Sequence, residues 1–313
     1  MQPEVALPAA FAVAALSTFA LTPLAIRLAL RTGFLDRPLG YKGHARPTPY
    51  LGGVALAGGV SVAALIFGAA TSTYAVLLVC ALGLWALGTL DDRRNLSPLT
   101  RVAAEVCVGL LLWGTGFGWD VLGSASADAL LTVLWVVGIV NAFNLMDNMN
   151  GAAASTAGVS ALGAAGLALG GGEPALAALC LAIAGACAGF LPFNLARPSK
   201  IFMGDGGSML LGSLVAAVTM SAASLGAAHP SAIVVGALVA GLAILDTTLV
   251  TVSRRRGGRP LLSGGRDHLT HRLARRLGSA QRVPLALAGG QTVLCAVAIA
   301  AAHADPAWVL TAG

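Results

Sequence analysis

Long apolar runs separated by short polar connections make up almost the whole chain. Runs of about 17–25 apolar residues are long enough to cross the hydrocarbon of a bilayer as helices, and the sequence contains about ten of them. Their expected ranges are 5–28, 51–70, 73–90, 99–118, 128–146, 152–170, 174–195, 207–228, 231–253 and 282–303. The pattern therefore predicts an all-α polytopic membrane protein that forms a single transmembrane domain over residues 1–313.

The composition supports this class of protein. Of the 313 residues, 57% are hydrophobic and only 10% are charged, whereas soluble domains carry about 25% charged residues. A net charge of +6 would suggest nucleic acid as the partner of a soluble protein. In a membrane chain the distribution of that charge matters more, and we expect the lipid bilayer, not nucleic acid, to be the partner.

The basic residues are confined to alternate connections. All 19 Lys and Arg residues lie in or beside the connections that follow the first, third, seventh and ninth runs. The connections on the other side contain none, and the acidic residues of that side are Glu4, Asp120, Asp128, Glu173 and Asp305. Because cytoplasmic connections are enriched in Lys and Arg, we expect both termini to be extracytoplasmic and the basic connections to be cytosolic.

Four polar clusters fall at the ends of apolar runs, all on the predicted cytosolic side. They occupy residues 88–98, 141–151, 204–208 and 266–272. An Asp at the centre of a membrane helix costs about 2.5–3.5 kcal/mol on insertion scales, so polar residues at these positions usually mark function. The clusters therefore predict a functional site on the cytosolic face.

The first cluster contains two adjacent carboxylates, Asp91 and Asp92. Neighbouring residues at a helix end point in different directions, so one could face a substrate while the other meets a cation or a basic group. Two close carboxylates favour a bound cation or a raised pKa, and either property suits phosphate chemistry. The alternative is a helix end whose acids are solvated beside Arg93 and Arg94.

The second and third clusters offer ligands for a cation and for phosphate. Asn141, Asn144 and Asp147 are three residues apart and would share one helix face. Such a stripe supplies oxygen ligands for a hard cation and amides for a nucleobase or sugar, and a polar helix cap is the alternative. Asp205 lies between glycines at the start of a run, where a helix N-terminus favours phosphate. Ser208 could be the N-cap of that helix.

The fourth cluster is basic. His268 and His271 could bind a metal, but a third ligand is not apparent, and the flanking arginines suit a clamp on pyrophosphate better. A short amphipathic helix that forms a basic patch on the membrane surface is the alternative. Ten residues after Asp91, Arg101 is expected to pair with Glu105 and could also reach a phosphate.

Two further polar residues lie at or inside apolar runs. Asp246 falls within the ninth run and is either a structural hydrogen-bond acceptor or a site residue. Asn194 ends the seventh run and could be a helix cap or a contact to a base.

Five segments then occur in a fixed order: RPTPYLGG, GTLDDRRNLSP, NAFNLMDNMNG, IFMGDGGS and DHLTHRL. Together they resemble the signatures of the polyprenyl-phosphate N-acetylhexosamine-1-phosphate transferase family, and the likeness covers nearly the whole chain. Members of this family transfer a sugar-1-phosphate from a UDP-sugar to undecaprenyl phosphate or a close relative and release UMP. They use Mg²⁺ or Mn²⁺ at a cytosolic site in the bacterial plasma membrane.

The resemblance implies a role for each matched position. Asp91 would be the catalytic base that accepts the proton of the lipid phosphate, Asp92 would be its partner, and Asn144 and Asp205 would hold the metal. The candidate substrate-binding residues are Lys42, Arg101, Asn141, Asp147, Asn148, Asn150, Asn194, Ser208, His268, His271 and Arg272. The resemblance leaves one direct displacement and an aspartyl-phosphate intermediate equally open.

The sequence departs from the family pattern at several positions. Asn150 stands where many bacterial relatives have Asp, Arg101 where Lys is usual, and Thr270 where many relatives have a further histidine. The single histidines and Asp246 make the chain more similar to the N-acetylglucosamine-1-phosphate branch than to the muramyl-pentapeptide branch. We expect UDP-N-acetylhexosamine and polyprenyl phosphate as partners, with a homodimer as an open alternative.

Two other classes of protein compete with this interpretation. A transporter would place polar groups near the middle of the bilayer and would show broken or repeated helices, whereas the polar clusters here lie at one edge. A non-catalytic relative that binds lipid would not need the full set of Asp91, Asp92, Asn144 and Asp205.

Overall fold

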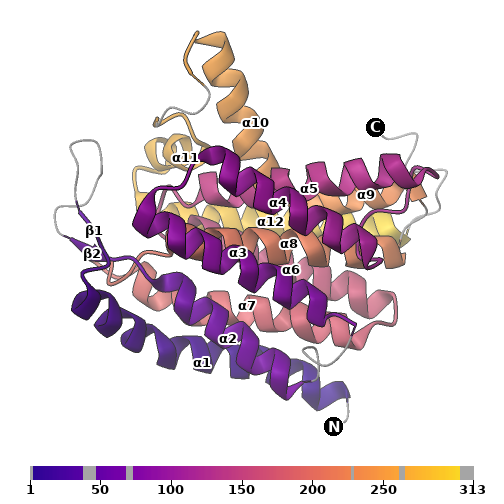
Figure 1. The fold of residues 1–313 in the computed structure, drawn as a ribbon, viewed down its shortest axis with the longest axis horizontal. Helices are drawn as coiled ribbons and strands as arrows, with labels where there is room; N and C mark the ends of the chain where they lie inside the picture. The colour runs from indigo at the N-terminus through magenta and orange to yellow at the C-terminus, as the bar shows by residue number, and fades with distance from the viewer. Residues whose placement is uncertain (1–2, 38–46, 68–72, 227–228, 261–264, 304–313) are drawn as a thin grey trace.

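The computed structural model describes residues 3–37, 47–67, 73–226, 229–260 and 265–303, which form a bundle of helices (Figure 1). The helices are α1 (Pro3–Thr32), α2 (Gly52–Ile66), α3 (Ala75–Arg94), α4 (Pro98–Gly114), α5 (Ala125–Met146), α6 (Ala152–Gly170), α7 (Pro174–Asn194), α8 (Gly204–Gly226), α9 (His229–Val239), α10 (Gly241–Arg256), α11 (Leu269–Leu277) and α12 (Val283–His303). Two short antiparallel strands, β1 (Leu35–Asp36) and β2 (Thr48–Pro49), pair at one end of the bundle. The predicted all-α class is confirmed.

The number of membrane spans is smaller by length and composition than the sequence suggested. Among the described residues, seven helices are long and apolar enough to cross a membrane, or eight if the bent pair α9–α10 is one span. The predicted second span is a helix of only 15 residues, α2, which at 1.5 Å per residue reaches about 22 Å of the roughly 30 Å of hydrocarbon. The predicted fourth span, α4, has 17 residues. A polytopic membrane protein is supported, and the count of ten stays a prediction.

The ends of the bundle differ in character. Figure 1 shows the start of α1 and the end of α12 at one end, and β1, β2 and the start of α4 at the other. This arrangement fits the prediction that both termini lie on one side and the basic connections on the other. The orientation relative to a membrane stays a prediction.

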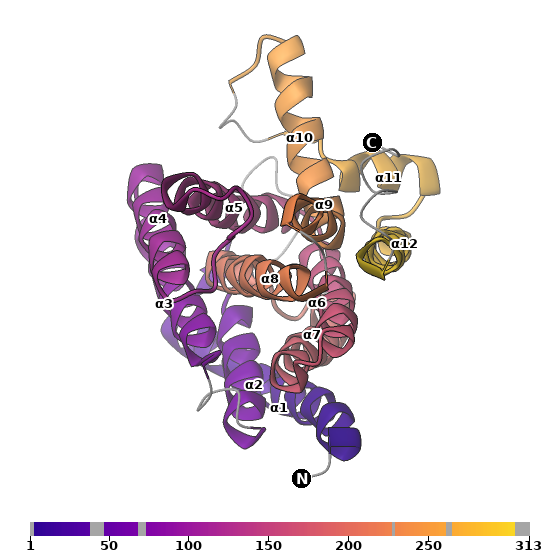
Figure 2. The ribbon, with the colours of Figure 1, turned by 90° about the vertical axis from the view of Figure 1, so that its right-hand side faces the viewer.

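Helix α8 lies in the middle of the bundle, and 83% of its apolar membrane-spanning stretch is buried inside the protein. Figure 2 shows it enclosed by its neighbours, and its packing partners include α3, α5 and α6. Small residues allow this packing: a Cβ on Gly212 would lie 2.8 Å from the Cα of Val140 in α5. Similarly, a Cβ on Gly185 of α7 would lie 2.1 Å from the backbone oxygen of Phe11 in α1. Close backbone contact of this kind is how membrane helices associate where apolar burial gives little driving force.

Candidate active site

The N-terminus of α8 is held by a side chain from α3. The carboxylate of Asp92 accepts the N–H of Asp205 on Oδ1 at 2.8 Å and the N–H of Gly206 on Oδ2 at 3.2 Å. The first N–H groups of a helix have no partner within the helix, so Asp92 supplies two of the missing acceptors. The interpretation of Ser208 as the N-cap was wrong, because α8 already begins at Gly204.

This capping changes the expectation of phosphate binding at the same N-terminus. Two of its N–H groups, those of Asp205 and Gly206, already donate to a carboxylate. An anion at those two groups would have to displace Asp92. The adjacent carboxylates therefore do point in different directions, as predicted, with Asp92 directed at the backbone of α8.

Helices α3 and α8 touch backbone to backbone at the site. A Cβ on Gly88, one turn before Asp92, would lie 2.5 Å from the backbone oxygen of Asp205 and 2.8 Å from the Cα of Gly206. Contacts that close do not occur, so any side chain at position 88 would push the α8 N-terminus away. The GTLDD motif of α3 and the GDGG motif of α8 therefore pack directly against each other.

We expect Gly88→Ala to reduce sugar-phosphate transfer by about tenfold or more, because a displacement of about 1 Å at reacting groups is costly. Gly83→Ala, five residues earlier in α3, is the matched control, since a Cβ there meets no atom within 4 Å. The measurement is the rate of lipid-linked product formation at equal amounts of purified protein. Equal rates for both variants would show that the close contact does not position the site.

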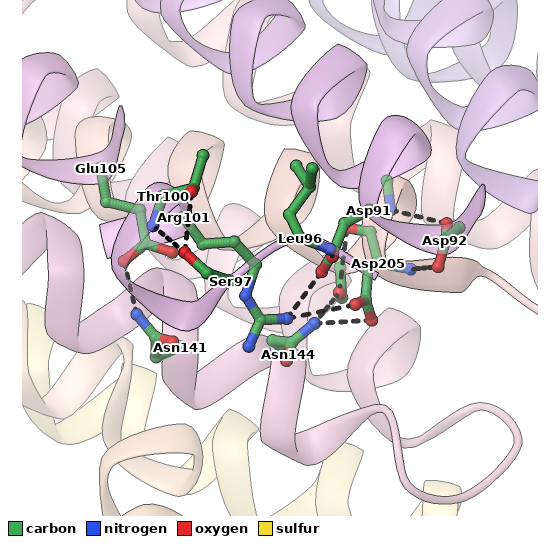
Figure 3. A network of polar contacts seen from close by, with 12 residues as sticks. Asp91, Asp92, Leu96, Ser97, Thr100, Arg101, Glu105, Asn141, Asn144 and Asp205 are labelled. Carbon is green, nitrogen blue, oxygen red and sulfur yellow. Dashed lines mark hydrogen bonds and ion pairs between the residues drawn. The ribbon is translucent and has the colours of Figure 1, made fainter. Parts of the chain in front are cut away.

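Arg101 joins two carboxylates through a single nitrogen (Figure 3). Its Nη1 lies 2.8 Å from Oδ2 of Asp91 and 3.3 Å from Oδ2 of Asp205. The other oxygen of Asp91 accepts the backbone N–H of Leu96, and Asp91 is only 5% exposed. Both oxygens of Asp91 therefore have hydrogen-bond partners. Asp91 holds the connection between α3 and α4 in place, and it is also the candidate catalytic base.

The predicted pair between Arg101 and Glu105 is not formed among the described side chains. Glu105, which is buried, instead accepts a hydrogen bond from Nδ2 of Asn141 at 2.5 Å. One helix turn separates Arg101 from Glu105, but the first faces α3 and α8 whereas the second faces α5. Asn141, a candidate for substrate binding, thus holds α4 against α5, and its contact with substrate stays a prediction.

Asn144 connects α5 to the start of α8. Its Nδ2 donates to Oδ1 of Asp205 at 2.9 Å and to Oγ of Ser208 at 3.0 Å, and Figure 3 shows it beside Arg101. The hydroxyl of Ser208 also donates to the backbone oxygen of Asp205. Since the amide nitrogen of Asn144 faces Asp205, its oxygen is the atom that could ligate a cation.

A cavity of about 290 Å³ opens beside these groups, and we call it the acidic cavity. Its lining residues are Asp36, Tyr50, Asp91, Asp92, Asn95, Leu96, Arg101 and Asp205. Of these described residues, four carry carboxylates and one carries a guanidinium. This excess of negative charge would repel a phosphate substrate, so phosphate binding at this cavity would require a cation.

The donor set fits a hard divalent ion. Mg²⁺ binds one or two protein carboxylate or amide oxygens and completes its shell with water and phosphate oxygens. Among the residues that the structure describes, no group of three or more His, Cys, Asp or Glu side chains is arranged to hold a metal. An ion here would need an amide oxygen as well, and Asn144 and Asp205 as its ligands stay a prediction.

The RPTPYLGG motif has a structural role that the sequence did not reveal. The N–H groups of Gly52 and Gly53 donate to the backbone oxygens of Phe202 and Met203, at 3.0 and 2.9 Å. A Cβ on Gly53 would lie 2.5 Å from the nitrogen of Gly207. The paired glycines therefore fasten the segment that leads into Asp205.

Tyr50, in the same motif, lines the acidic cavity and was also missed. Burial raises the pKa of its phenol well above the ordinary value, and the carboxylates of Asp92 and Asp205 raise it further. Tyr50 is therefore a neutral hydrogen-bonding group at pH 7. Its position between Pro49 and Leu51, in a motif with two prolines and two glycines, was the available signal.

The turn after α5 extends the site toward α11. Burial raises the pKa of Asp147 well above its usual range, and the carboxylates of Asp205 and Asp92 raise it further. Asn148 donates to the backbone oxygen of Leu145 and accepts a short hydrogen bond from Thr270. Thr270 is thus a buried link between the turn after α5 and α11.

Helix α11 is attached to α10 by a second contact. Oδ2 of the buried Asp246 lies 2.9 Å from Nδ1 of His268, and its Oδ1 accepts the N–H of Leu269. Asp246 is therefore the acceptor that caps α11, the first of its two predicted roles. Burial lowers the pKa of His271, and His268 and the nearby arginines lower it further, so His271 is mainly neutral at pH 7.

Three other candidates are placed as follows. Asn194 is buried and bonds the backbone on both sides, accepting from Gly151 N at 2.6 Å and donating to Ile201 O at 2.9 Å. This geometry favours its structural alternative over contact with a base. Asn150 lies half-buried in the turn after α5. Lys42 lies outside the described residues.

Comparison with known proteins gives consistent names. Residues 74–223 match the family described as glycosyl transferase family 4. The chain is 33% identical over 278 residues to a probable undecaprenyl-phosphate N-acetylglucosaminyl 1-phosphate transferase of Bacillus subtilis, an alignment that covers 84% of this chain and 76% of that protein. It is 35% identical over 300 residues to a decaprenyl-phosphate N-acetylglucosaminephosphotransferase of Mycolicibacterium smegmatis, covering 83% and 73%.

A phospho-N-acetylmuramoyl-pentapeptide-transferase of Geobacillus kaustophilus is 34% identical over 257 residues, covering 70% of this chain and 76% of that protein. The segment that matches the family contains Asp91, Asp92, Arg101 and Asp205, which line the acidic cavity, and Asn144, which donates to Asp205. The predicted resemblance is confirmed, and this chain belongs to glycosyl transferase family 4.

Proposed function

We propose that this protein transfers N-acetylglucosamine-1-phosphate from UDP-N-acetylglucosamine to undecaprenyl phosphate or a similar polyprenyl phosphate and releases UMP. The observation that carries the proposal is the acidic cavity, where Asp91, Arg101 and Asp205 meet at one end of a membrane helix bundle. A site at the ends of helices is accessible both to a water-soluble nucleotide sugar and to a lipid phosphate. Relatives named for this reaction support the choice of substrates.

We propose Mg²⁺ or Mn²⁺ as the cofactor, held by Asn144 and Asp205. The reasons are the oxygen donor set and the excess of carboxylates in the cavity lining. Such an ion, when bound, would neutralise charge on the phosphate oxygens. Phosphoryl transfer asks the protein mainly for positioning and charge stabilisation, and that is what the interlocked contacts of α3, α4, α5 and α8 supply.

In the proposed reaction, an oxygen of the lipid phosphate forms a bond to the β-phosphorus of the UDP-sugar, and the bond from that phosphorus to the bridging oxygen breaks. UMP leaves with the bridging oxygen. Asp91 would accept the proton of the lipid phosphate, which requires one of its contacts to Leu96 or Arg101 to open. Direct displacement and an aspartyl-phosphate intermediate both remain compatible with this geometry.

The turn after α5 and helix α11 would bind the rest of the donor. Asp147, Asn148 and Asn150 are proposed for the nucleoside, and His268, His271 and Arg272 for the phosphates and the sugar. Asn144 contacts Asp205, and Asn148, four residues later, contacts Thr270. The end of α5 and the turn after it therefore connect Asp205 to α11. A neutral His271 would donate a hydrogen bond and add no charge.

The muramyl-pentapeptide reaction is the second candidate, since a transferase of that name also matches. We expect membranes that contain this protein to form labelled lipid from UDP-N-acetylglucosamine and not from UDP-N-acetylmuramoyl-pentapeptide. The measurement is extraction of the labelled lipid together with detection of UMP, with Asp205→Asn membranes as the blank. Product from the pentapeptide donor alone would reverse the assignment, and no UMP from either donor would favour a non-catalytic relative.

We further propose that the protein resides in the bacterial plasma membrane, with ten membrane-embedded segments, both termini outside and the acidic cavity facing the cytosol. The charge distribution of the connections supports this orientation. The homodimer stays a prediction.

A further inference from the structure

A second cavity lies between α10 and α11, and we call it the arginine groove. Its volume is about 530 Å³. Four leucines line it, Leu245 and Leu249 from α10 and Leu269 and Leu273 from α11. Arginines of α11 form the rest of the lining, and no lining residue is shared with the acidic cavity. The groove is therefore a separate feature of the described chain.

The groove faces outward because α10 leaves the bundle. The chain bends by 84° between α9 and α10, and Figures 1 and 2 show α10 projecting from the other helices. Leu245 is 49% exposed and Val252 is 40% exposed on this helix. In a membrane protein, exposed apolar side chains beside the bundle are covered by hydrocarbon, so lipid is the natural neighbour of the groove.

The arginines in the groove differ from two arginines at and just after the end of α10. Arg254 and Arg259 both contact the carboxylate of Asp267, at 3.1 and 3.3 Å. Arg275 and Arg276 are exposed, and no described carboxylate forms an ion pair with either. Two unneutralised guanidinium groups therefore stand next to the leucines.

We propose that the arginine groove binds one anionic phospholipid of the surrounding bilayer. Its headgroup phosphate lies on Arg275 and Arg276, and one acyl chain lies along the leucines. Guanidinium groups bind phosphate oxygens with charge-assisted hydrogen bonds, and basic residues at the membrane surface attract anionic lipid. The polyprenyl substrate is the less suitable occupant, because its phosphate must reach the acidic cavity, which has a different lining.

The test is native mass spectrometry of the whole protein, released from detergent that contains phosphatidylglycerol and phosphatidylcholine at equal concentrations. We expect the wild-type protein to retain one phosphatidylglycerol in preference to phosphatidylcholine. Arg275→Gln with Arg276→Gln should weaken that retention by about tenfold or more, since each basic residue contributes to attraction of anionic lipid. Arg272 is left unchanged because it is a candidate for substrate binding.

The matched control is Arg255→Gln with Arg256→Gln. This pair is also adjacent, exposed and at the end of a helix, but it does not line the groove. Its phosphatidylglycerol retention should equal that of the wild-type protein. Leu273→Asn should weaken retention with every arginine present, which provides an independent variant if the double glutamine variant does not fold.

Three results would overturn the proposal. Equal retention of both phospholipids by the wild-type protein would remove the charge preference, and equal losses in the two double variants would remove the specific site. Displacement of the retained phosphatidylglycerol by one equivalent of undecaprenyl phosphate would identify the groove as a site for the substrate. None of these readouts depends on catalytic activity, so they are independent of the proposed function.

Discussion

Asp205→Asn is expected to lower the rate of sugar-phosphate transfer by about 100- to 1000-fold, the usual effect of removing one group that stabilises charge in an active site. Asp205 accepts a hydrogen bond from Asn144 on Oδ1 and one from Arg101 on Oδ2. The substitution keeps the shape of the side chain but removes its charge, so it weakens both the proposed cation site and the contact to Arg101. The measurement is transfer of labelled sugar phosphate to lipid by purified protein.

Two observations accompany the loss of rate. Because Asn is a weaker ligand than Asp, the concentration of Mg²⁺ needed for half-maximal activity should rise in the variant. Asp120→Asn, an exposed carboxylate in the connection between α4 and α5, is the control and should behave like the wild-type protein. A near-normal rate with an unchanged Mg²⁺ requirement in Asp205→Asn would refute both its metal role and the proposed site.

Asp91→Asn is expected to lower the rate by about 100-fold or more, because general-base catalysis contributes about 10²–10⁴. The structure shows that Asp91 also holds Arg101 at 2.8 Å, so a loss of rate by itself would not distinguish a base from a positioning residue. A double-mutant cycle with Arg101→Gln separates the two roles. If Asp91 accepts the proton, its substitution stays costly when Arg101 is already absent.

Arg101→Lys provides the matched control for that cycle. Both contacts of Arg101 to carboxylates use the single nitrogen Nη1, so the fork of the guanidinium is not used and one ammonium could replace it. We expect Arg101→Lys to retain most of the activity that Arg101→Gln loses. If Asp91→Asn has no further effect in the Arg101→Gln background, Asp91 only positions Arg101, and the proposed base must be sought elsewhere.

The close packing at the site explains why its geometry was hard to foresee. Asp92 and Asp205 are 113 residues apart, and their contact exists because Gly88 and Gly53 let the backbones of three segments meet. A glycine in a sequence predicts that a side chain is not tolerated, but it does not tell which backbone comes close. The role of RPTPYLGG as a fastening of the Asp205 segment followed only from the folded chain.

Local sequence patterns also predicted the wrong interaction partners for some polar side chains. The spacing of Arg101 and Glu105 predicted a pair within α4, yet each side chain contacts a different helix. Spacing of four residues within one helix is worth only about 0.2–0.5 kcal/mol per pair, so nearby carboxylates on α3 and α8 outweigh it. Ser208 was predicted to cap α8, but Asp92 from α3 accepts the N–H groups at the start of that helix instead.

The sequence by itself determined the class of the protein, the positions of most of its helices and the residues that gather at one end, because hydrophobic period, length and alternating charge are local properties that the membrane enforces. It did not predict that the expected ninth run, 231–253, is divided into α9 and α10. It also determined the family, because five motifs in a fixed order survive without knowledge of their contacts. Only the tertiary structure decided that Asp92 caps α8, that Arg101 joins Asp91 to Asp205, and that α10 leaves the bundle to form the arginine groove. Those features depend on which surfaces come within a few ångströms across long sequence separations, and that is settled by the packing of the whole bundle.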